Sequence, residues 1–233
     1  MTFTSLASSS RGNAYVVSDG ETTLLLECGL SFRELQKRLG YGVADITACL
    51  VSHEHQDHAK AAAQMLKAGV PVYMSEGTAA AHKDAMDAAH LIRAGEVLRF
   101  GYLTVVPFRT YHNVEEPLGF LIEDGRTKER LLWAVDTANL GVTADRLTYI
   151  AVECNYEESL LDRSDRIPSL LKERIRHSHF EVNDVIKWLH KQDLSGVLTI
   201  WLLHLSAGNS RAEAWQRRFE REFPGIEIRI CPE

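Results

Sequence analysis

Four side chains of the types that bind metal ions occur within six residues of this chain, in the run His53-Glu54-His55-Gln56-Asp57-His58. Imidazole and carboxylate groups are ligands for zinc and for manganese. His53 and His55 are two residues apart, so on extended backbone their side chains point the same way. Asp57 and His58 are adjacent, and we expect them to diverge toward a second metal position. A loop has no structural need for such a cluster, so the run predicts a metal site.

The stretches on either side of this run indicate how it is held. Residues 46–52, Ile-Thr-Ala-Cys-Leu-Val-Ser, form an apolar stretch that predicts a buried strand. Residues 59–68 are helix formers, and Gly69 is the expected C-cap. The candidate ligands therefore lie on a strand-to-helix loop, where a rigid scaffold can direct side chains toward a bound group.

Three further residues of ligand type come at the ends of predicted strands. His112 follows a hairpin predicted over residues 97–110, Asp136 ends the apolar stretch 130–135, and His204 ends a later apolar stretch. Taken singly, each of them is an ordinary turn residue. The sequence alone therefore gives them no role beyond their position.

Two other histidines are interpreted as structural. His82 and His90 lie in or beside residues 78–89, an alanine-rich stretch that predicts a helix. Two capping boxes, at Ser31 and at Ser210, predict the starts of two more helices.

Composition limits the class of protein. The chain has 233 residues, 45% hydrophobic and 25% charged, which predicts one globular domain over residues 1–233. The formal net charge is −6, so binding of nucleic acid would need a local patch or bound metal ions. The four cysteines are dispersed and mostly lie in apolar stretches, which predicts reduced thiols and a cytoplasmic location. We expect no signal peptide and no membrane-spanning segment.

The spacing His-x-His-x-Asp-His resembles the signature of the metallo-β-lactamase superfamily. The resemblance implies an α/β fold, a four-layer αββα sandwich with two divalent metal ions, zinc or manganese, at one edge of its sheets. It also implies that His112, Asp136 and His204 are ligands. One metal ion would take His53, His55 and His112, and the other Asp57, His58 and His204, with Asp136 bridging both. Glu27, which ends the predicted strand 22–27, stands where the superfamily usually has a supporting aspartate.

Several stretches resemble a narrower subgroup, the WalJ-like (YycJ-like) bacterial and phage proteins. They are residues 5–13, 117–120, 153–155, 171–175 and 204–206. Members are regarded as nucleases with 5′ exonuclease activity on DNA, so the resemblance implies a metal-dependent phosphodiesterase with a nucleic-acid substrate, DNA in the first place, and no membrane partner. Where the subgroup has Gly-His-Leu-Ser-Asn, this chain has Ser178-His179-Phe180-Glu181-Val182-Asn183, so His179 carries over and its neighbours do not.

The resemblance also assigns the catalytic roles. Asp57 is expected to act in catalysis as well as in metal binding. His179 is expected to protonate the leaving alkoxide or to hold the phosphate. Two metal ions roughly 3.5–4 Å apart lower the pKa of a bridging water and hold both oxygens of an in-line displacement. The sequence leaves open the roles of four polar residues, the native metal and the oligomeric state. These residues are Glu27, Glu153, Asn155 and Asn209.

A second interpretation keeps the fold and changes the substrate. A small-molecule hydrolase, such as a thioesterase, a lactonase or a cyclic-nucleotide phosphodiesterase, would use the same metal site. The acidic net charge favours this alternative, whereas His179 and the near full-length subgroup resemblance favour a nuclease. A non-catalytic metal-binding protein is the weakest interpretation, because every expected ligand is present.

Overall fold

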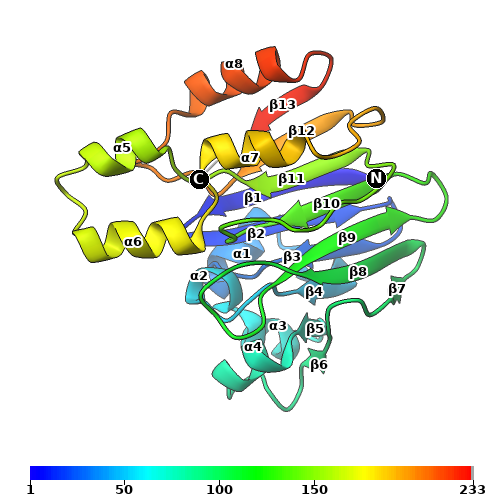
Figure 1. The fold of residues 1–233 in the computed structure, drawn as a ribbon. Coiled ribbons are helices and arrows are strands. Elements are labelled where there is room, and N and C mark those ends of the chain that lie inside the picture. Colours follow the sequence, from blue (N-terminus) through cyan, green and yellow to red (C-terminus); the bar gives the residue numbers. More distant parts are fainter. Residues whose placement is uncertain (232–233) are drawn as a thin grey trace. The chain divides into compact units, whose positions relative to one another are not determined.

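The computed structural model describes residues 1–231, which divide into two compact units. Unit 1 comprises residues 1–109 and 114–129, and unit 2 comprises residues 110–113 and 130–231. Each unit combines β-strands with helices, which confirms the predicted α/β class (Figure 1). Within residues 1–231, no helix has the length and apolar character needed to cross a membrane.

Unit 1 contains a six-stranded sheet whose strands are ordered in space as they are along the chain. The first three strands pair antiparallel, and the third to the sixth pair parallel. Three more strands of unit 1 form an antiparallel ribbon, which includes the predicted hairpin. The nine strands described for unit 1 are β1 (Thr2–Ser9), β2 (Gly12–Ser18), β3 (Thr23–Leu26), β4 (Ala48–Leu50), β5 (Val72–Met74), β6 (His90–Leu91), β7 (Leu98–Phe100), β8 (Leu103–Arg109) and β9 (Leu118–Asp124).

The helices of unit 1 pack their apolar side chains against the six-stranded sheet. Leu35 of the first helix and Met65 of the third lie in one buried cluster with Leu25, Cys49 and Met74 from the strands. The helices are α1 (Phe32–Arg38), α2 (Gln56–Ala59), α3 (Ala62–Lys67) and α4 (Glu76–Ala81), with a 3₁₀ turn at Val43–Asp45. The first of them is capped by Ser31 as predicted, because its side chain accepts a hydrogen bond from the amide of Glu34.

The helix predicted over residues 59–68 is instead two short helices. α2 begins inside the histidine-rich run, so Asp57 and His58 lie in its first turn. The two helices are separated because the amide of Ala61 donates to the carbonyl of Cys28, 2.9 Å away, and not to a carbonyl within α2. The helix predicted over residues 78–89 is also shorter, since α4 ends at Ala81 and turns follow.

Unit 2 is built on a parallel sheet with the strand order β10-β11-β12-β13. Glu153 of β11 pairs with Leu203 of β12, so the carboxyl ends of these neighbouring strands lie together at one edge of the sheet. β12 is buried along its whole length, as expected for a strand of a covered parallel sheet. The strands are β10 (Arg130–Ala134), β11 (Tyr149–Glu153), β12 (Thr199–Leu203) and β13 (Glu227–Ile230).

The helices of unit 2 include an amphipathic helix, α7, and a neighbouring pair, α5 and α6 (Figure 1). Arg176 of α6 holds this pair together through ion pairs with Glu158 and Asp162 of α5, at 2.7 and 2.5 Å. The capping box predicted at Ser210 is wrong, because α8 begins after Arg211 without a side-chain cap. The helices are α5 (Glu158–Arg163), α6 (Ser169–Ser178), α7 (Val182–Leu189) and α8 (Ala212–Glu222).

Candidate metal centre

In unit 1, the strand that precedes the histidine-rich run lies beside β3, which ends next to Glu27. β3 and β4 are parallel, so Glu27 and Ser52 lie at the same edge of the sheet. Glu27 Oε1 accepts a hydrogen bond from the amide of Ser52 at 3.1 Å, and Glu27 Oε2 lies 3.6 Å from Nδ1 of His58. Burial raises the pKa of Glu27, against the opposing effects of His58 and Ser52. The carboxylate is fully buried, so it supports the loop and does not face solvent.

The four candidate ligands of the run form two close pairs. His53 Nε2 lies 3.0 Å from His55 Nδ1, as their spacing of two predicts. Asp57 Oδ2 lies 3.4 Å from His58 Nε2, so these two side chains converge and the predicted divergence is wrong. Adjacent residues of a helix point about 100° apart, and the imidazole of His58 is long enough for its Nε2 to approach the Asp57 carboxylate across that angle. Two ligand atoms that bind the same ion at 2.0–2.2 Å lie roughly 3–3.5 Å from each other. The distances within the His53–His55 pair and the Asp57–His58 pair both fall in this range.

Residues outside the run fix its backbone. The side-chain amide of Asn13 donates to the carbonyl of Asp57 at 3.2 Å, and a Cβ at Gly29 would overlap that carbonyl oxygen. His82, which the sequence did not associate with the site, is buried, and its Nε2 donates to the carbonyl of Glu54 at 2.8 Å. His90 is exposed and stacks on Tyr73, which agrees with a structural role.

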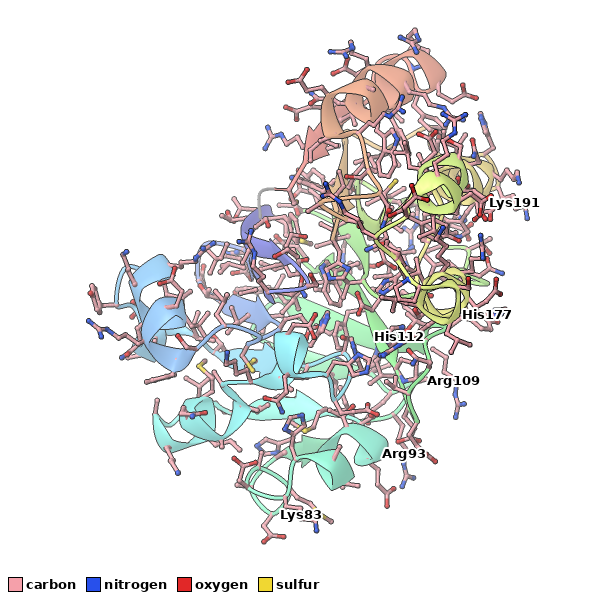
Figure 2. All side chains as sticks on the ribbon, turned by 90° about the vertical axis from the view of Figure 1, so that its left-hand side faces the viewer. Lys83, Arg93, Arg109, His112, His177 and Lys191 are labelled. Atoms are coloured by element: carbon pink, nitrogen blue, oxygen red, sulfur yellow. The ribbon has the colours of Figure 1, made fainter. Side chains whose placement is uncertain are left out.

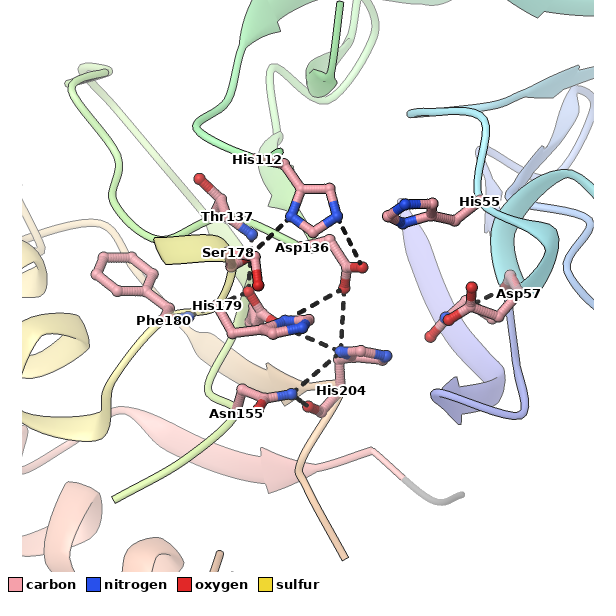
Figure 3. A network of polar contacts seen from close by, with 12 residues as sticks. His55, Asp57, His112, Asp136, Thr137, Asn155, Ser178, His179, Phe180 and His204 are labelled. Carbon is pink, nitrogen blue, oxygen red and sulfur yellow. Dashed lines mark hydrogen bonds and ion pairs between the residues drawn. The ribbon is translucent and has the colours of Figure 1, made fainter. Parts of the chain in front are cut away.

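In unit 2, polar side chains cluster at the carboxyl edge of the parallel sheet (Figure 3). Asp136 follows β10 by two residues, Glu153 is the last residue of β11, and His204 follows β12 directly. One ligand atom each of Asp136, Glu153, His179 and His204 lie within 4.8 Å of one another. The adjacent ends of parallel strands bring these residues together, although 68 positions separate Asp136 from His204 in the sequence.

Glu153 is the centre of this cluster, and the sequence left its role open. Its Oε1 accepts hydrogen bonds from Nδ1 of His179 at 2.6 Å and Nδ1 of His204 at 3.1 Å. Its Oε2 accepts from the amides of Thr137 at 2.8 Å and Phe180 at 3.3 Å. Burial would raise the pKa of Glu153, but its interactions with the two histidines outweigh burial and lower it. Since both oxygens accept hydrogen bonds, Glu153 orients the two histidines.

His112 is oriented in a similar way by the backbone. Its Nδ1 donates to the carbonyl of Ser178 at 2.8 Å, which leaves the lone pair on Nε2, 3.6 Å from Asp136 Oδ2. Burial lowers the pKa of His112 although Asp136 opposes this effect, so the neutral form that binds metal is favoured. Figure 2 shows His112 well inside the outer surface of unit 2, whereas His177 lies at that surface and is exposed.

Asn155, another residue whose role was open, holds the segment that carries His204. Its side-chain amide donates to the carbonyl of His204 at 2.8 Å and lies 3.3 Å from Nδ1 of the same residue. Asn155 is buried, so this contact fixes the backbone at the end of β12.

Three residues of the two clusters have a left-handed backbone. The φ angles are 67° at Glu27, 45° at Asp136 and 52° at His204. Residues other than glycine rarely adopt such angles, which cost on the order of 1–3 kcal/mol each. Each of these residues lies within two positions of a strand end. The strained backbone turns the chain out of the sheet and sets the direction of the side chain.

The donor chemistry of both clusters fits divalent metal ions. Each unit supplies only imidazole nitrogens and carboxylate oxygens, the donors that zinc and manganese take in proteins. In unit 1, the Glu27 carboxylate approaches Nδ1 of His58, and the side-chain amide of Asn13 holds the backbone of Asp57. In unit 2, Nδ1 of His112 contacts the Ser178 carbonyl, and Nδ1 of His204 contacts the Glu153 carboxylate. Such supporting hydrogen bonds are typical of metal-binding histidines.

Comparison with known proteins places the chain in a family. The profile of the beta-lactamase superfamily domain matches residues 22–200. The exodeoxyribonuclease YycJ of Bacillus anthracis is 29% identical over 232 residues, which cover 91% of this chain and 84% of the relative. The exodeoxyribonuclease WalJ of Streptococcus pneumoniae is 26% identical over 229 residues, 89% of this chain and 82% of the relative. The crystal structure of the metallo-β-lactamase fold protein YhfI from Bacillus subtilis has a TM-score of 0.74 at 17% identity, and the match covers 99% of this chain and 96% of YhfI.

These similarities confirm two predictions from the sequence. The likeness to YhfI confirms the metallo-β-lactamase fold, and the similarity to YycJ and WalJ confirms the resemblance to their subgroup. The family profile covers more than half of the sequence. The chain therefore belongs to the beta-lactamase superfamily, as a hydrolase of the metallo-β-lactamase fold.

Proposed function

We propose that this chain is a metal-dependent phosphodiesterase that degrades nucleic acid, with DNA cleaved from its 5′ end as the first candidate substrate. The observation that carries the proposal is the contact between Glu153 and His179 in unit 2, at 2.6 Å. This contact supports a role for His179 as a proton donor beside the candidate metal ligands. A phosphodiester needs both functions, because its negative charge requires cations and its alkoxide leaving group requires a proton.

The residues of both units are proposed to hold two divalent metal ions. The ligands would be His53, His55 and His112 for one ion, Asp57, His58 and His204 for the other, and Asp136 for both. When bound, such a pair of ions supplies a hydroxide nucleophile at neutral pH and neutralises the phosphate. The donor types and the spacings within each unit support this assignment. Zinc and manganese both suit it.

The chain's own residues orient these ligands and handle the proton. Glu27 and Asn13 fix His58 and Asp57, and Asp57 is proposed to act in catalysis through this fixed position. Glu153 accepts from Nδ1 of His179, so a proton carried on the opposite nitrogen, Nε2, can pass to the leaving oxygen. The ionised carboxylate favours the charged imidazolium, which is the form that donates a proton.

The choice of a nucleic-acid substrate rests on the relatives. YycJ and WalJ are named exodeoxyribonucleases, and each similarity extends over more than four fifths of both chains. The alternative is a small-molecule hydrolase, a thioesterase, a lactonase or a cyclic-nucleotide phosphodiesterase, which the net charge of −6 favours. A thioesterase would have little use for a proton donor in the position of His179, because a thiolate leaves without protonation, whereas a lactonase also releases an alkoxide.

An activity assay distinguishes these functions. The protein loaded with zinc or manganese is incubated with 5′-phosphorylated duplex DNA, single-stranded DNA, RNA, a thioester, a lactone and bis(p-nitrophenyl) phosphate. We expect metal-dependent cleavage of DNA from its 5′ end, and loss of that activity in Asp136→Ala. Turnover of the thioester or lactone without cleavage of either phosphodiester class would contradict the proposal.

We propose that both units act together as one hydrolase domain over residues 1–233, because each supplies part of the ligand set. We also propose a cytoplasmic location, which is supported by three buried cysteines outside any disulfide, Cys28, Cys49 and Cys154.

A further inference from the structure

A pocket of about 450 Å³ lies in unit 2, next to the loop that follows His204. One side of it is formed by the end of α5 and the connection to α6, including Arg163 and Arg166. The other side is formed by Gly208 and Asn209. Its volume is sufficient for a nucleotide unit and exceeds what a bare phosphate would occupy.

The two arginines of the pocket are not neutralised by the protein. Arg163 and Arg166 are exposed, and no ion pair or hydrogen bond of their side chains is found within the described part of the chain, residues 1–231. The acidic residues of α5 and α6 form ion pairs with Arg176 instead: Glu158, Asp162 and Glu173. This division leaves both guanidinium groups of the pocket without an ion pair among residues 1–231, and guanidinium groups are the preferred donors for phosphate oxygens.

The remaining lining residues indicate which phosphate fits. Asp165 also lines the pocket, so its side chains carry a net charge of +1, from two arginines and one aspartate. This balance matches the single charge of a phosphodiester better than the nearly double charge of a terminal phosphate. Leu160 and Ile167 add apolar surface, against which a sugar or base can pack.

Asn209 is a buried polar residue in the lining of the pocket. It is only 3% exposed, and its Oδ1 has no hydrogen-bond partner among residues 1–231, while its Nδ2 lies 3.1 Å from Ser206 Oγ. The oxygen and nitrogen of a side-chain amide can exchange places by a rotation of 180°. In the rotated form, Oδ1 accepts from the Ser206 hydroxyl and the NH₂ group becomes a donor for a ligand in the pocket.

Hydrogen bonds tie the pocket to the cluster around Glu153. The amide of Glu157 donates to the carbonyl of Asn209, and the amide of Ser206 donates to the carbonyl of Asn155, both at 2.9 Å. Asn155 in turn holds the backbone of His204 at 2.8 Å. Asn209 is five residues from His204, which limits their separation to roughly 17 Å at full extension. A strand with one phosphate at the cluster can therefore reach the pocket within a few nucleotides.

We propose that this pocket binds a backbone phosphodiester and sugar of the substrate strand, a few nucleotides from the bond that is cut. The proposal rests on the proposed nuclease function and makes it more specific. It explains how a chain of net charge −6 holds a polyanion: local arginines, unpaired within the described residues 1–231, supply the attraction. It also predicts a preference for oligonucleotides over small phosphodiesters.

The test uses charge changes in both directions. We expect Arg163→Glu/Arg166→Glu to weaken binding of a cleavage-resistant phosphorothioate single strand at least tenfold, measured by fluorescence anisotropy. The slope of log Kd against log salt should fall by roughly 0.7 for each phosphate that the variant no longer neutralises. Asp165→Asn, which removes the opposing charge, should tighten binding severalfold at low salt. Arg221→Glu, at an exposed arginine of α8 outside the pocket, is the matched control and should change little.

Kinetics separate the pocket from the proposed function. In the double variant, the loss of kcat/KM should be at least tenfold greater for an oligonucleotide than for bis(p-nitrophenyl) phosphate. We expect this loss to come from a higher KM, with kcat nearly unchanged. Equal KM values in wild type and double variant, or an equal loss in Arg221→Glu, would overturn the pocket and leave the nuclease function standing. Arginine-dependent binding of the strand without any cleavage by the wild type would retain the pocket and reject the nuclease.

Discussion

The carboxylate of Glu153 determines how two histidines of unit 2 are oriented. It receives both Nδ1 atoms on one oxygen and two backbone amides on the other, inside a fully buried environment. An amide in this position could not accept from both imidazoles and both backbone groups, because half of its polar face would be a donor. The chemistry proposed for His179 therefore depends on this neighbour.

Glu153→Gln is expected to lower kcat by roughly 10–100-fold, the usual effect of losing a group that orients metal-site histidines. The fold should be retained, because glutamine has nearly the same volume. Steady-state kinetics and metal analysis of the purified variant measure the effect. Glu158→Gln is the control, since that carboxylate pairs with Arg176 of α6 and lies outside the cluster around Glu153. A kcat equal to that of the wild type in Glu153→Gln would show that the orientation of the histidines does not depend on the Glu153 carboxylate.

His179→Ala should retain bound metal and slow cleavage of DNA by about 10²–10⁴-fold, the range typical of a positioned general acid. On bis(p-nitrophenyl) phosphate the same change should have a much smaller effect, because p-nitrophenolate leaves without a proton. The contrast between the two substrates separates proton donation from phosphate binding, which would slow both alike. Small and equal effects would reject the role of His179 and favour the small-molecule alternative.

At the scale of elements, α4 supports the histidine-rich run although it contributes no candidate ligand. His82, at the end of α4, holds the carbonyl of Glu54 between His53 and His55. A hydrogen bond at this point limits movement of the two imidazoles that are proposed to bind one ion. The helix thus acts as a brace for the loop in unit 1.

We expect His82→Ala to weaken metal binding by about tenfold, a typical cost of losing a supporting hydrogen bond. His82→Gln, which keeps an N–H donor of similar reach, should recover most of the affinity. His90→Ala is the matched control, because His90 is exposed and stacks on Tyr73 away from the run. Titration with zinc in competition with a chromophoric chelator measures all three. Equal metal affinities for His82→Ala and His90→Ala would reject a supporting role for His82.

The turn after β9 depends on a buried carboxylate. Asp124 Oδ1 accepts from the amide of Arg126 at 2.8 Å. Burial would raise the pKa of Asp124, but the backbone amides of Arg126 and Thr127 and the nearby charge of Arg126 outweigh burial and lower it. A pKa lowered in the folded state stabilises the fold above the unfolded pKa, and this stabilisation is lost as the pH falls through the folded value.

Asp124→Ala is therefore expected to lower the free energy of unfolding by about 1–3 kcal/mol at pH 7, because charge-assisted hydrogen bonds are lost. The difference from wild type should shrink as the pH falls below about 4, the ordinary pKa of an aspartate, and vanish once the pH passes the lowered pKa of the folded carboxyl. Urea denaturation at pH 7 and at several acidic values gives both quantities. A difference that does not change with pH would mean that packing, and not the charge, stabilises this turn.

Much of this arrangement could be predicted from the sequence, because it depends on local spacing. The pairing of His53 with His55 follows from a period of two, and the strands before Asp136 and His204 follow from apolar runs. The contacts of Asn13 with Asp57 and of Glu153 with His179 could not be predicted, since the partners are 44 and 26 residues apart. The break between α2 and α3 has the same origin, because its cause is a carbonyl of the distant Cys28.

At the scale of the whole molecule, the proposed ligands come from stretches far apart in the sequence, from His53 to His204. Bound ions should therefore stabilise the folded protein as a whole, because the unfolded chain does not hold these groups together. Ions at a concentration of 100 times their Kd contribute about 2.7 kcal/mol per site. We therefore propose that metal content and global stability are linked in this chain.

Removal of metal with a chelator is expected to lower Tm by several degrees, and added zinc or manganese should restore it. Metal analysis of the restored protein should approach two ions per chain, and Asp136→Ala should reduce the occupancy of both positions and weaken the shift in Tm. Scanning calorimetry with elemental analysis provides both measurements. A folded protein that takes up no ion from excess zinc and manganese, with an unchanged Tm, would reject the ligand assignment.

The left-handed backbone at Glu27, Asp136 and His204 has a consequence for the history of such a chain. Glycine at any of these positions would relieve the torsion but would delete a side chain that is assigned to the proposed metal site or to its support. Selection for thermal stability alone would therefore favour glycine variants that are more stable but have lost the proposed function. Directed evolution of this protein for heat tolerance should hold these three codons fixed and seek its gains elsewhere.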